Sequence, residues 1–116
     1  MGKSYKELIV WQKAMEVAKN VYVLVKKLPK EETYALSDQM RRAAVSIPSN
    51  IAEGQGRASS REFSQFLSIA RGSALELETQ LQLCVMIQYL NQEEIQPTMN
   101  LLEEIERMIH SIKQRL

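Results

Sequence analysis

The chain has 116 residues, of which 45% are hydrophobic and 25% are charged, and its formal net charge is +1. These values are typical of a single soluble globular domain over residues 1–116, and they exclude a protein that binds nucleic acid through its overall charge. Because no apolar run reaches the length of a membrane span, we expect no membrane partner. The single cysteine, Cys84, indicates a reducing, cytoplasmic setting.

The first helix is predicted over residues 5–28. It opens at Ser4, whose spacing from Glu7 is that of a capping box, and Pro29 closes it. Seven side chains recur at intervals of three and four residues, which predicts one buried stripe. These are Leu8, Trp11, Met15, Ala18, Tyr22, Val25 and Leu28.

The second helix is predicted from about Thr33 to Glu53. Gly54 or Gly56 is expected to end it in the left-handed conformation that glycine tolerates. The residues expected to face the core are Leu36, Met40, Ala43, Ile47 and Ile51.

A third helix is predicted from Ser59 to about Leu90, and a fourth from about Asn91 to the end of the chain. Both starts carry a capping box, completed by Glu62 and Glu94. The third stripe is Phe63, Phe66, Leu67, Ala70, Ala74, Leu77, Leu81, Cys84 and Gln88, and the fourth is Ile95, Met99, Leu102, Ile105, Ile109, Ile112 and Leu116. Four amphipathic helices with short connections predict an all-α, antiparallel up-down-up-down four-helix bundle.

The helices also carry more aliphatic side chains than one stripe each requires. The surplus residues are Ile9, Val10, Val17, Val23, Leu24, Ile69, Leu75, Leu83, Leu101 and Met108. A broad core stripe would bury some of them, but all of them together would leave a large apolar patch on a monomer. The surplus therefore predicts a homo-oligomer.

Residues that could support catalysis are sparse. The one histidine, His110, follows Glu106 by four residues, whereas a di-metal bundle needs Glu-x-x-His spacing on two helices. We expect His110 to pair with Glu106 across one helical turn. One cysteine and one histidine cannot form a zinc site, and the glycines after the second helix match no nucleotide-binding motif. The sequence therefore predicts no enzyme, no metal and no cofactor.

A polar row surrounds the proline in the segment RRAAVSIPSNIAEGQGR, residues 41–57. Its members, with their expected counterparts on the third helix, are Ser46, Pro48, Asn50, Glu53, Ser73 and Glu76. In a hairpin that turns near residue 57, the residue numbers of two facing positions should add up to about 115. This places Arg42 opposite Ser73. One interpretation is a hydrogen-bonded fastener around a proline kink. The other is a surface that contacts a ligand or a phosphate.

Basic side chains form the second candidate surface. Those that could contact nucleic acid or a partner are Lys6, Lys13, Lys19, Lys26, Lys27, Arg41, Arg42, Arg57, Arg61 and Arg71. The lysines of the first helix suit a solvated face, and in a ring of subunits they would equally suit a polyanion. No aromatic residue interleaves with these lysines, so base stacking is not expected.

Two long segments resemble a known family. The runs LIVWQKAMEVAKNVY (8–22) and LPKEETYALSDQMRRAAVSIPSNIAEGQGRASSREFSQFLSIARGSALELETQL (28–81) resemble the four-helix-bundle proteins encoded within bacterial 23S rRNA intervening sequences. The resemblance implies a homopentameric barrel of bundles. It also implies similarity to the accessory variability protein of diversity-generating retroelements, a basic pentamer that binds nucleic acid and a reverse transcriptase.

Together, the residues and the resemblance predict a non-catalytic oligomeric scaffold. Its basic surface residues would bind structured RNA, such as rRNA, another nucleic acid or a ribonucleoprotein. The alternative is a protein-interaction module that docks a partner such as a reverse transcriptase without touching nucleic acid.

Overall fold

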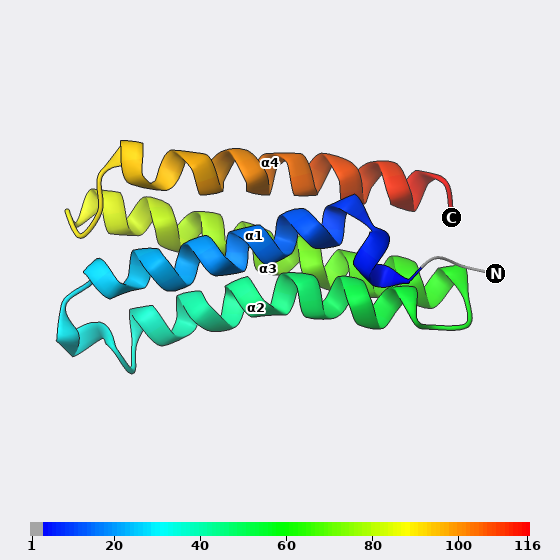
Figure 1. Ribbon diagram of the computed structural model, residues 1–116, viewed down its shortest axis with the longest axis horizontal. Coiled ribbons are helices and arrows are strands. Elements are labelled where there is room, and N and C mark those ends of the chain that lie inside the picture. The colour runs from blue at the N-terminus through cyan, green and yellow to red at the C-terminus, as the bar shows by residue number, and fades with distance from the viewer. Residues whose placement is uncertain (1–3) are drawn as a thin grey trace.

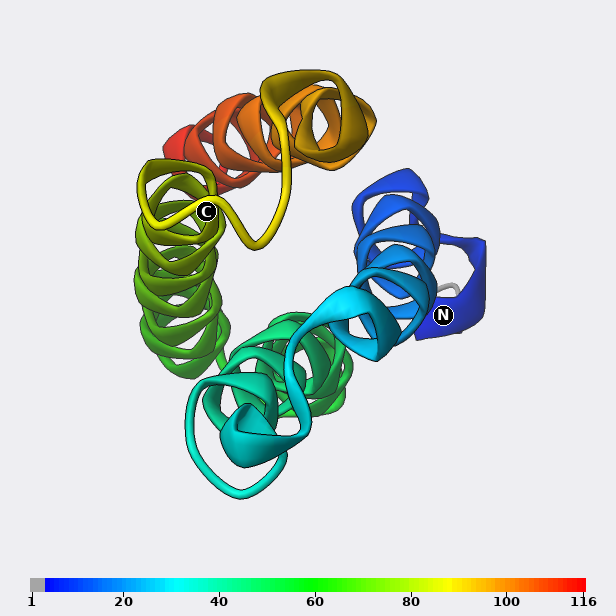
Figure 2. The ribbon, with the colours of Figure 1, turned by 90° about the vertical axis from the view of Figure 1, so that its left-hand side faces the viewer.

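The computed structural model describes residues 4–116, which form α helices and short 3₁₀ turns without any strand. The four long helices are α1 (Ile9–Leu24), α2 (Leu36–Gln55), α3 (Ser60–Met86) and α4 (Gln92–Gln114). They alternate in direction along an axis of 46 Å (Figure 1). Viewed from one end, they follow each other around a square, and α1 and α4 close it by packing together (Figure 2). The predicted up-down-up-down bundle is therefore confirmed for the single chain.

The first helix is shorter than predicted because 3₁₀ turns replace its two ends. These turns are η1 (Tyr5–Glu7) and η2 (Val25–Lys27), and a third, η3 (Lys30–Glu32), leads toward α2. Ser4 caps η1 by accepting a hydrogen bond from the Lys6 amide at 3.2 Å. The backbone of Leu8 is extended and separates η1 from α1. Ser4 is therefore a cap, as predicted, but it caps the single turn η1 that precedes α1.

The caps of the last two helices lie where the sequence predicts them. Asn91 accepts from the Glu94 amide at 2.8 Å, and the Glu94 carboxylate accepts from the Asn91 amide at 2.9 Å. Ser59 accepts from the Glu62 amide at 3.1 Å. Each cap satisfies amides that the first helical turn leaves free. These starts are determined by local sequence.

Helix α3 ends four residues earlier than predicted. Its last residue is Met86, and Gln88 adopts a left-handed φ of 66°. The Tyr89 amide then donates to the Cys84 carbonyl at 2.8 Å, which satisfies a carbonyl at the helix end. Gln88 is exposed, so its assignment to the buried stripe was wrong.

Neither of the two glycines after Glu53 adopts the left-handed conformation that the sequence predicts. Gly54 lies inside α2, and Gly56 has a φ of −80°. No glycine among residues 4–116 has a positive φ. A β-carbon on Gly54 would lie 2.6 Å from the β-carbon of Phe66, so the absence of a side chain lets α2 and α3 approach closely. Phe63 on α3 is also near this position, at 3.1 Å.

The predicted stripe of the first helix is only partly confirmed. Val25 and Leu28 are buried, and Leu8, Trp11 and Ala18 pack partly buried against the core. Met15 and Tyr22 are 45% and 47% exposed, whereas a purely aliphatic row faces the core. That row is Val10, Ala14, Val17, Val21 and Leu24, and it continues into Val25 and Leu28. Val10, Val17 and Leu24, which the sequence analysis counted as surplus, are therefore core residues. Small and β-branched side chains line α1 where α2 and α4 flank it, and the larger side chains of the predicted stripe lie toward the rim.

The stripes of the other helices are largely confirmed. Residues buried on α2, α3 and α4 include Met40, Ala43, Ile47, Ile51, Leu67, Ala70, Ala74, Leu77, Leu81, Cys84, Ile95, Leu102, Ile105 and Ile109. Leu116 lies beyond α4 and is 44% exposed, so it does not belong to the core. Five of the remaining surplus residues are exposed, namely Ile9, Val23, Ile69, Leu75 and Leu83, while Leu101 and Met108 pack partly buried against the core.

Candidate nucleic-acid interface

The most concentrated basic surface lies between α1 and α2. Tyr22 and Arg41 line two adjoining grooves of about 420 and 390 Å³. Lys26 and Lys30 line the first groove, and Arg42 lines the second. We call these five residues the α1–α2 surface. It combines four cationic side chains with one half-exposed aromatic ring.

The fold positions these side chains through the connection between α1 and α2. Extended backbone at Pro29 turns the chain into η3, which places Lys30 beside the end of α1. The Arg41 guanidinium donates to the Thr33 carbonyl at 3.0 Å, which holds it over the connection. Asp38 pairs with Arg42 at 3.0 Å, and it lies 3.9 Å from Arg41. One carboxylate against four cations leaves the α1–α2 surface with a net positive charge.

Tyr22 is the residue that sequence reasoning missed. It was assigned to the buried stripe, but it lies about 100° away from the aliphatic row around the helix axis and reaches the rim. Its exposed ring contributes to both grooves beside Arg41. Aromatic rings flanked by cations are the usual platform for stacked bases. The all-aliphatic spacing from Val10 to Leu24 was the signal that could have placed it correctly.

The lysines of α1 separate into two groups. Lys13 pairs with Glu104 at 3.3 Å and ties α1 to α4, and Lys27 pairs with Glu94 and ties η2 to α4. The hydrogen bond from Lys27 lowers the pKa of the Glu94 carboxyl. The exposed lysines with no such tie are Lys6, Lys19 and Lys26. These lysines, like Lys30 of the α1–α2 surface, are free to meet a polyanion.

The polar row around Pro48 forms a fastener between α2 and α3. The Asn50 amide donates to the Ser46 carbonyl at 2.8 Å and to the Ser46 hydroxyl at 2.9 Å. The Ser73 hydroxyl donates to the same Ser46 hydroxyl at 2.8 Å. Helix α2 continues through Pro48, which is buried. Glu53 and Glu76 take no part in these bonds. Glu53 pairs with Arg57, just after α2, and Glu76 accepts a hydrogen bond from Gln80 within α3.

The register of the α2–α3 hairpin differs from the prediction by about one turn. Ser46 and not Arg42 lies opposite Ser73, and Arg42 is an exposed partner of Asp38. Helical side chains lean toward the N-terminus of their own helix. In an antiparallel pair, the side chains of the two helices therefore lean in opposite directions along the bundle. As a result, the residue numbers of two facing positions add up to more than twice the residue number at the turn.

The remaining arginines lie away from the α1–α2 surface. Arg57 pairs with Glu53 at 2.6 Å and lies over the Phe66 ring, 4.9 Å from its centre. Arg61 is exposed in the first turn of α3, and Arg71 lines a groove on the opposite side, between α3 and α4. The ten predicted contact residues therefore do not form one site.

Two carboxyl groups face each other between α3 and α4. Burial and a hydrogen bond with Glu106 raise the pKa of Glu78 from 4.5 to about 8. Each of these residues has a buried carboxyl oxygen without a hydrogen-bond partner, and a second carboxylate close by favours the protonated form of Glu78. His110 pairs with Gln114 at 3.3 Å, so its predicted pairing with Glu106 was wrong. The Glu78 carboxyl provides the alternative partner for Glu106.

None of the helices over residues 4–116 is long and apolar enough to cross a membrane. Nor does that part of the chain bring together three or more histidine, cysteine or acidic side chains that could hold a metal ion.

Burial raises the pKa of the Cys84 thiol to about 11, and its sulfur lies against that of Met40.

The fold and its surfaces define an antiparallel four-helix bundle with a basic-aromatic face. The family model of the 23S rRNA-intervening sequence protein matches residues 6–111. A crystal structure of a protein of unknown function from the S23 ribosomal protein family of Bacteroides thetaiotaomicron is 31% identical, with a TM-score of 0.83, and the match covers 90% of this chain and 98% of that one. The comparison with curated proteins gives no match. The chain belongs to the 23S rRNA-intervening sequence protein family, which confirms the resemblance found in the sequence.

Proposed function

We propose that this protein is a non-catalytic, cytoplasmic scaffold that binds structured RNA through the α1–α2 surface. The observation that carries the proposal is the convergence of Lys26, Lys30, Arg41 and Arg42 around the half-exposed ring of Tyr22. The cations suit the phosphate backbone, and the ring suits an unstacked base in a loop or bulge. Membership of a family named for an rRNA intervening sequence supports RNA as the nucleic acid.

The proposal includes assembly into a ring of five subunits. Its support is the row of exposed apolar side chains on α3, a helix that is long enough to present them over several turns. These are Ile69, Leu75, Leu83 and Met86, with Ile87 just beyond the helix. Met86 is 80% exposed, and large apolar side chains exposed along one helix are typical of interfaces between proteins. A ring would repeat the α1–α2 surface on each subunit, which raises avidity for a long polyanion. Light scattering on the purified protein tests the ring, and a monomer would refute it.

RNA binding is tested by fluorescence anisotropy with a labelled RNA hairpin at several salt concentrations. Arg41→Gln should weaken binding and lower the slope of log K against log salt by about 0.9, because one phosphate contact is lost. Tyr22→Ala should cost about 1–3 kcal/mol from lost stacking, and Tyr22→Phe should retain most of the affinity. Arg115→Gln removes the same charge from the end of the chain and serves as the control. Salt-independent binding, or equal losses in Arg41→Gln and Arg115→Gln, would refute the proposal.

The competing proposal is a module that docks a protein, such as a reverse transcriptase, without contacting nucleic acid. The exposed apolar row of α3 is the observation that favours it, since that row suits a protein partner as well as a second copy of this chain. A pull-down from nuclease-treated lysate separates the two. Stoichiometric capture of one protein that survives nuclease, and is lost on Leu83→Glu, would favour docking. The same variant should leave RNA binding by the α1–α2 surface intact.

A further inference from the structure

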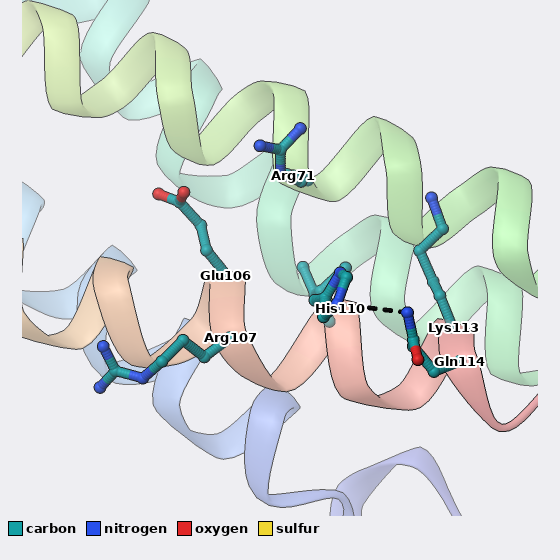
Figure 3. A pocket seen from close by; sticks show the side chains of 7 residues that line it. Arg71, Glu106, Arg107, His110, Lys113 and Gln114 are labelled. Atoms are coloured by element: carbon teal, nitrogen blue, oxygen red, sulfur yellow. Dashed lines mark hydrogen bonds between the residues drawn. The ribbon is translucent and has the colours of Figure 1, made fainter.

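A wide groove lies between α3 and α4, on the side away from the α1–α2 surface. Its volume is about 800 Å³, and the buried side chain of Ile109 contributes to its lining. Arg71 projects from α3, and His110, Lys113 and Gln114 project from α4 (Figure 3). Basic and neutral donor groups from two helices therefore border one open space.

The cations of this groove form no ion pair with the described residues. None of the ion pairs within 4.0 Å over residues 4–116 involves Arg71, Arg107 or Lys113. Lys113 instead donates to the Ser68 hydroxyl across the groove, which holds its ammonium close to α3. Arg107 points away from α3 and contributes charge at the outer edge (Figure 3). Three cations without an ion pair therefore line one groove.

The one carboxylate that lines the groove is already engaged. Glu106 extends toward α3 (Figure 3), where it hydrogen-bonds with Glu78. The groups that act on Glu78 are Glu106 and Glu103 from α4 and Arg71 from its own helix. Glu106 is the one acidic residue of the lining, against the cations of Arg71, Arg107 and Lys113. The groove therefore keeps a positive balance.

We propose that the groove between α3 and α4 binds a phosphate group, with Arg71 and Lys113 as its charged donors and His110 and Gln114 beside them. A guanidinium presents two parallel N–H groups that match two phosphate oxygens, and an ammonium adds a point charge. A doubly charged phosphate balances these cations better than a single carboxylate does. The group belongs either to a small phosphorylated molecule or to an RNA backbone.

His110 provides a direct reporter, because it is the only histidine in the chain. Inorganic phosphate is titrated into the full-length protein at constant ionic strength and pH, and the ring signals of His110 are followed by NMR. A saturable shift is expected with phosphate and not with chloride. Arg71→Gln and Lys113→Gln should each weaken phosphate binding by about tenfold or more, because each removes a charge-assisted hydrogen bond. Lys19→Gln, an exposed lysine of α1, should leave the curve unchanged.

Two further measurements identify the source of the phosphate and separate this site from the α1–α2 surface. An RNA hairpin that displaces phosphate from His110, and binds less tightly to Arg71→Gln, would identify a backbone phosphate. An RNA hairpin without effect would identify a small phosphorylated ligand, and either result supports the site. Tyr22→Ala should leave the His110 titration unaltered whether or not it affects RNA binding. The site is refuted if phosphate and chloride act alike on His110, or if Arg71→Gln and Lys113→Gln bind phosphate as the unaltered protein does.

Discussion

Replacing Glu78 with glutamine tests the carboxyl pair between α3 and α4. Glutamine has nearly the shape of a protonated glutamate, and its amide can donate to the Glu106 carboxylate in the same way. The substitution therefore keeps the hydrogen bond and removes the titration. Any dependence of folding stability on pH that comes from Glu78 should disappear in this variant.

The magnitude follows from the pKa of Glu78, which is raised from 4.5 to about 8. Between these values the folded protein holds one proton more than the unfolded chain, so stability falls as the pH rises. The contribution is fully present below pH 4.5 and is lost above about pH 8. Its full strength would be about 5 kcal/mol at about 1.4 kcal/mol per pH unit. Because solvent reaches part of this side chain, we expect about 2 kcal/mol.

Urea denaturation from about pH 5 to about pH 9 measures this difference. The variant and the unaltered protein should be similarly stable at the acid end, and the variant should be about 2 kcal/mol more stable at the alkaline end. Protein concentration is held constant, since the stability of an oligomer depends on it. Glu16→Gln, at an exposed position of α1, is the control. A stability difference that does not change with pH would contradict the raised pKa of Glu78.

The packing of α2 against α3 gives the remaining predictions. Gly54→Ala should lower the free energy of unfolding by about 1–3 kcal/mol, because its methyl group would lie 2.6 Å from a β-carbon of α3. Gly72→Ala meets open space and should raise it by about 0.5–1 kcal/mol, so opposite signs in urea denaturation are expected. Ser46→Ala and Ser73→Ala should each cost about 1 kcal/mol, and a double mutant that loses the full sum would show that the two hydroxyls are not coupled. Cys84, whose pKa burial raises to about 11, should react with a thiol-specific reagent only after unfolding, and rapid labelling of the folded protein would show that the thiol is accessible.

Local sequence determined the helices and most of their starts. The Asn91–Glu94 capping box and the Ser59 cap act within one helical turn, so no distant contact is needed to place them. The family was also identifiable from two continuous runs of the chain. The end of α3 was less predictable, because Gln88 takes the left-handed conformation that glycine usually supplies.

The charged surfaces were only partly predictable. The sequence identified Arg41, Arg42 and Lys26 as basic, but not that they surround Tyr22. It placed Arg71 with them, although this side chain belongs to a different groove. Which cations remain free depends on acidic partners from other helices, as in the Lys13–Glu104 pair.

What the sequence determined by itself is therefore the set of helices, their antiparallel order and the composition of their faces. Tertiary structure decided which face is used. On α1 two apolar rows lie about 100° apart, and only packing between α2 and α4 selects the row that contains Val17 and exposes the one that contains Tyr22. Between α2 and α3 it set the register that joins Ser46 to Ser73, because opposed side-chain leans shift the facing positions by about a turn. The site residues depend on these two choices, and both arise from contacts between helices.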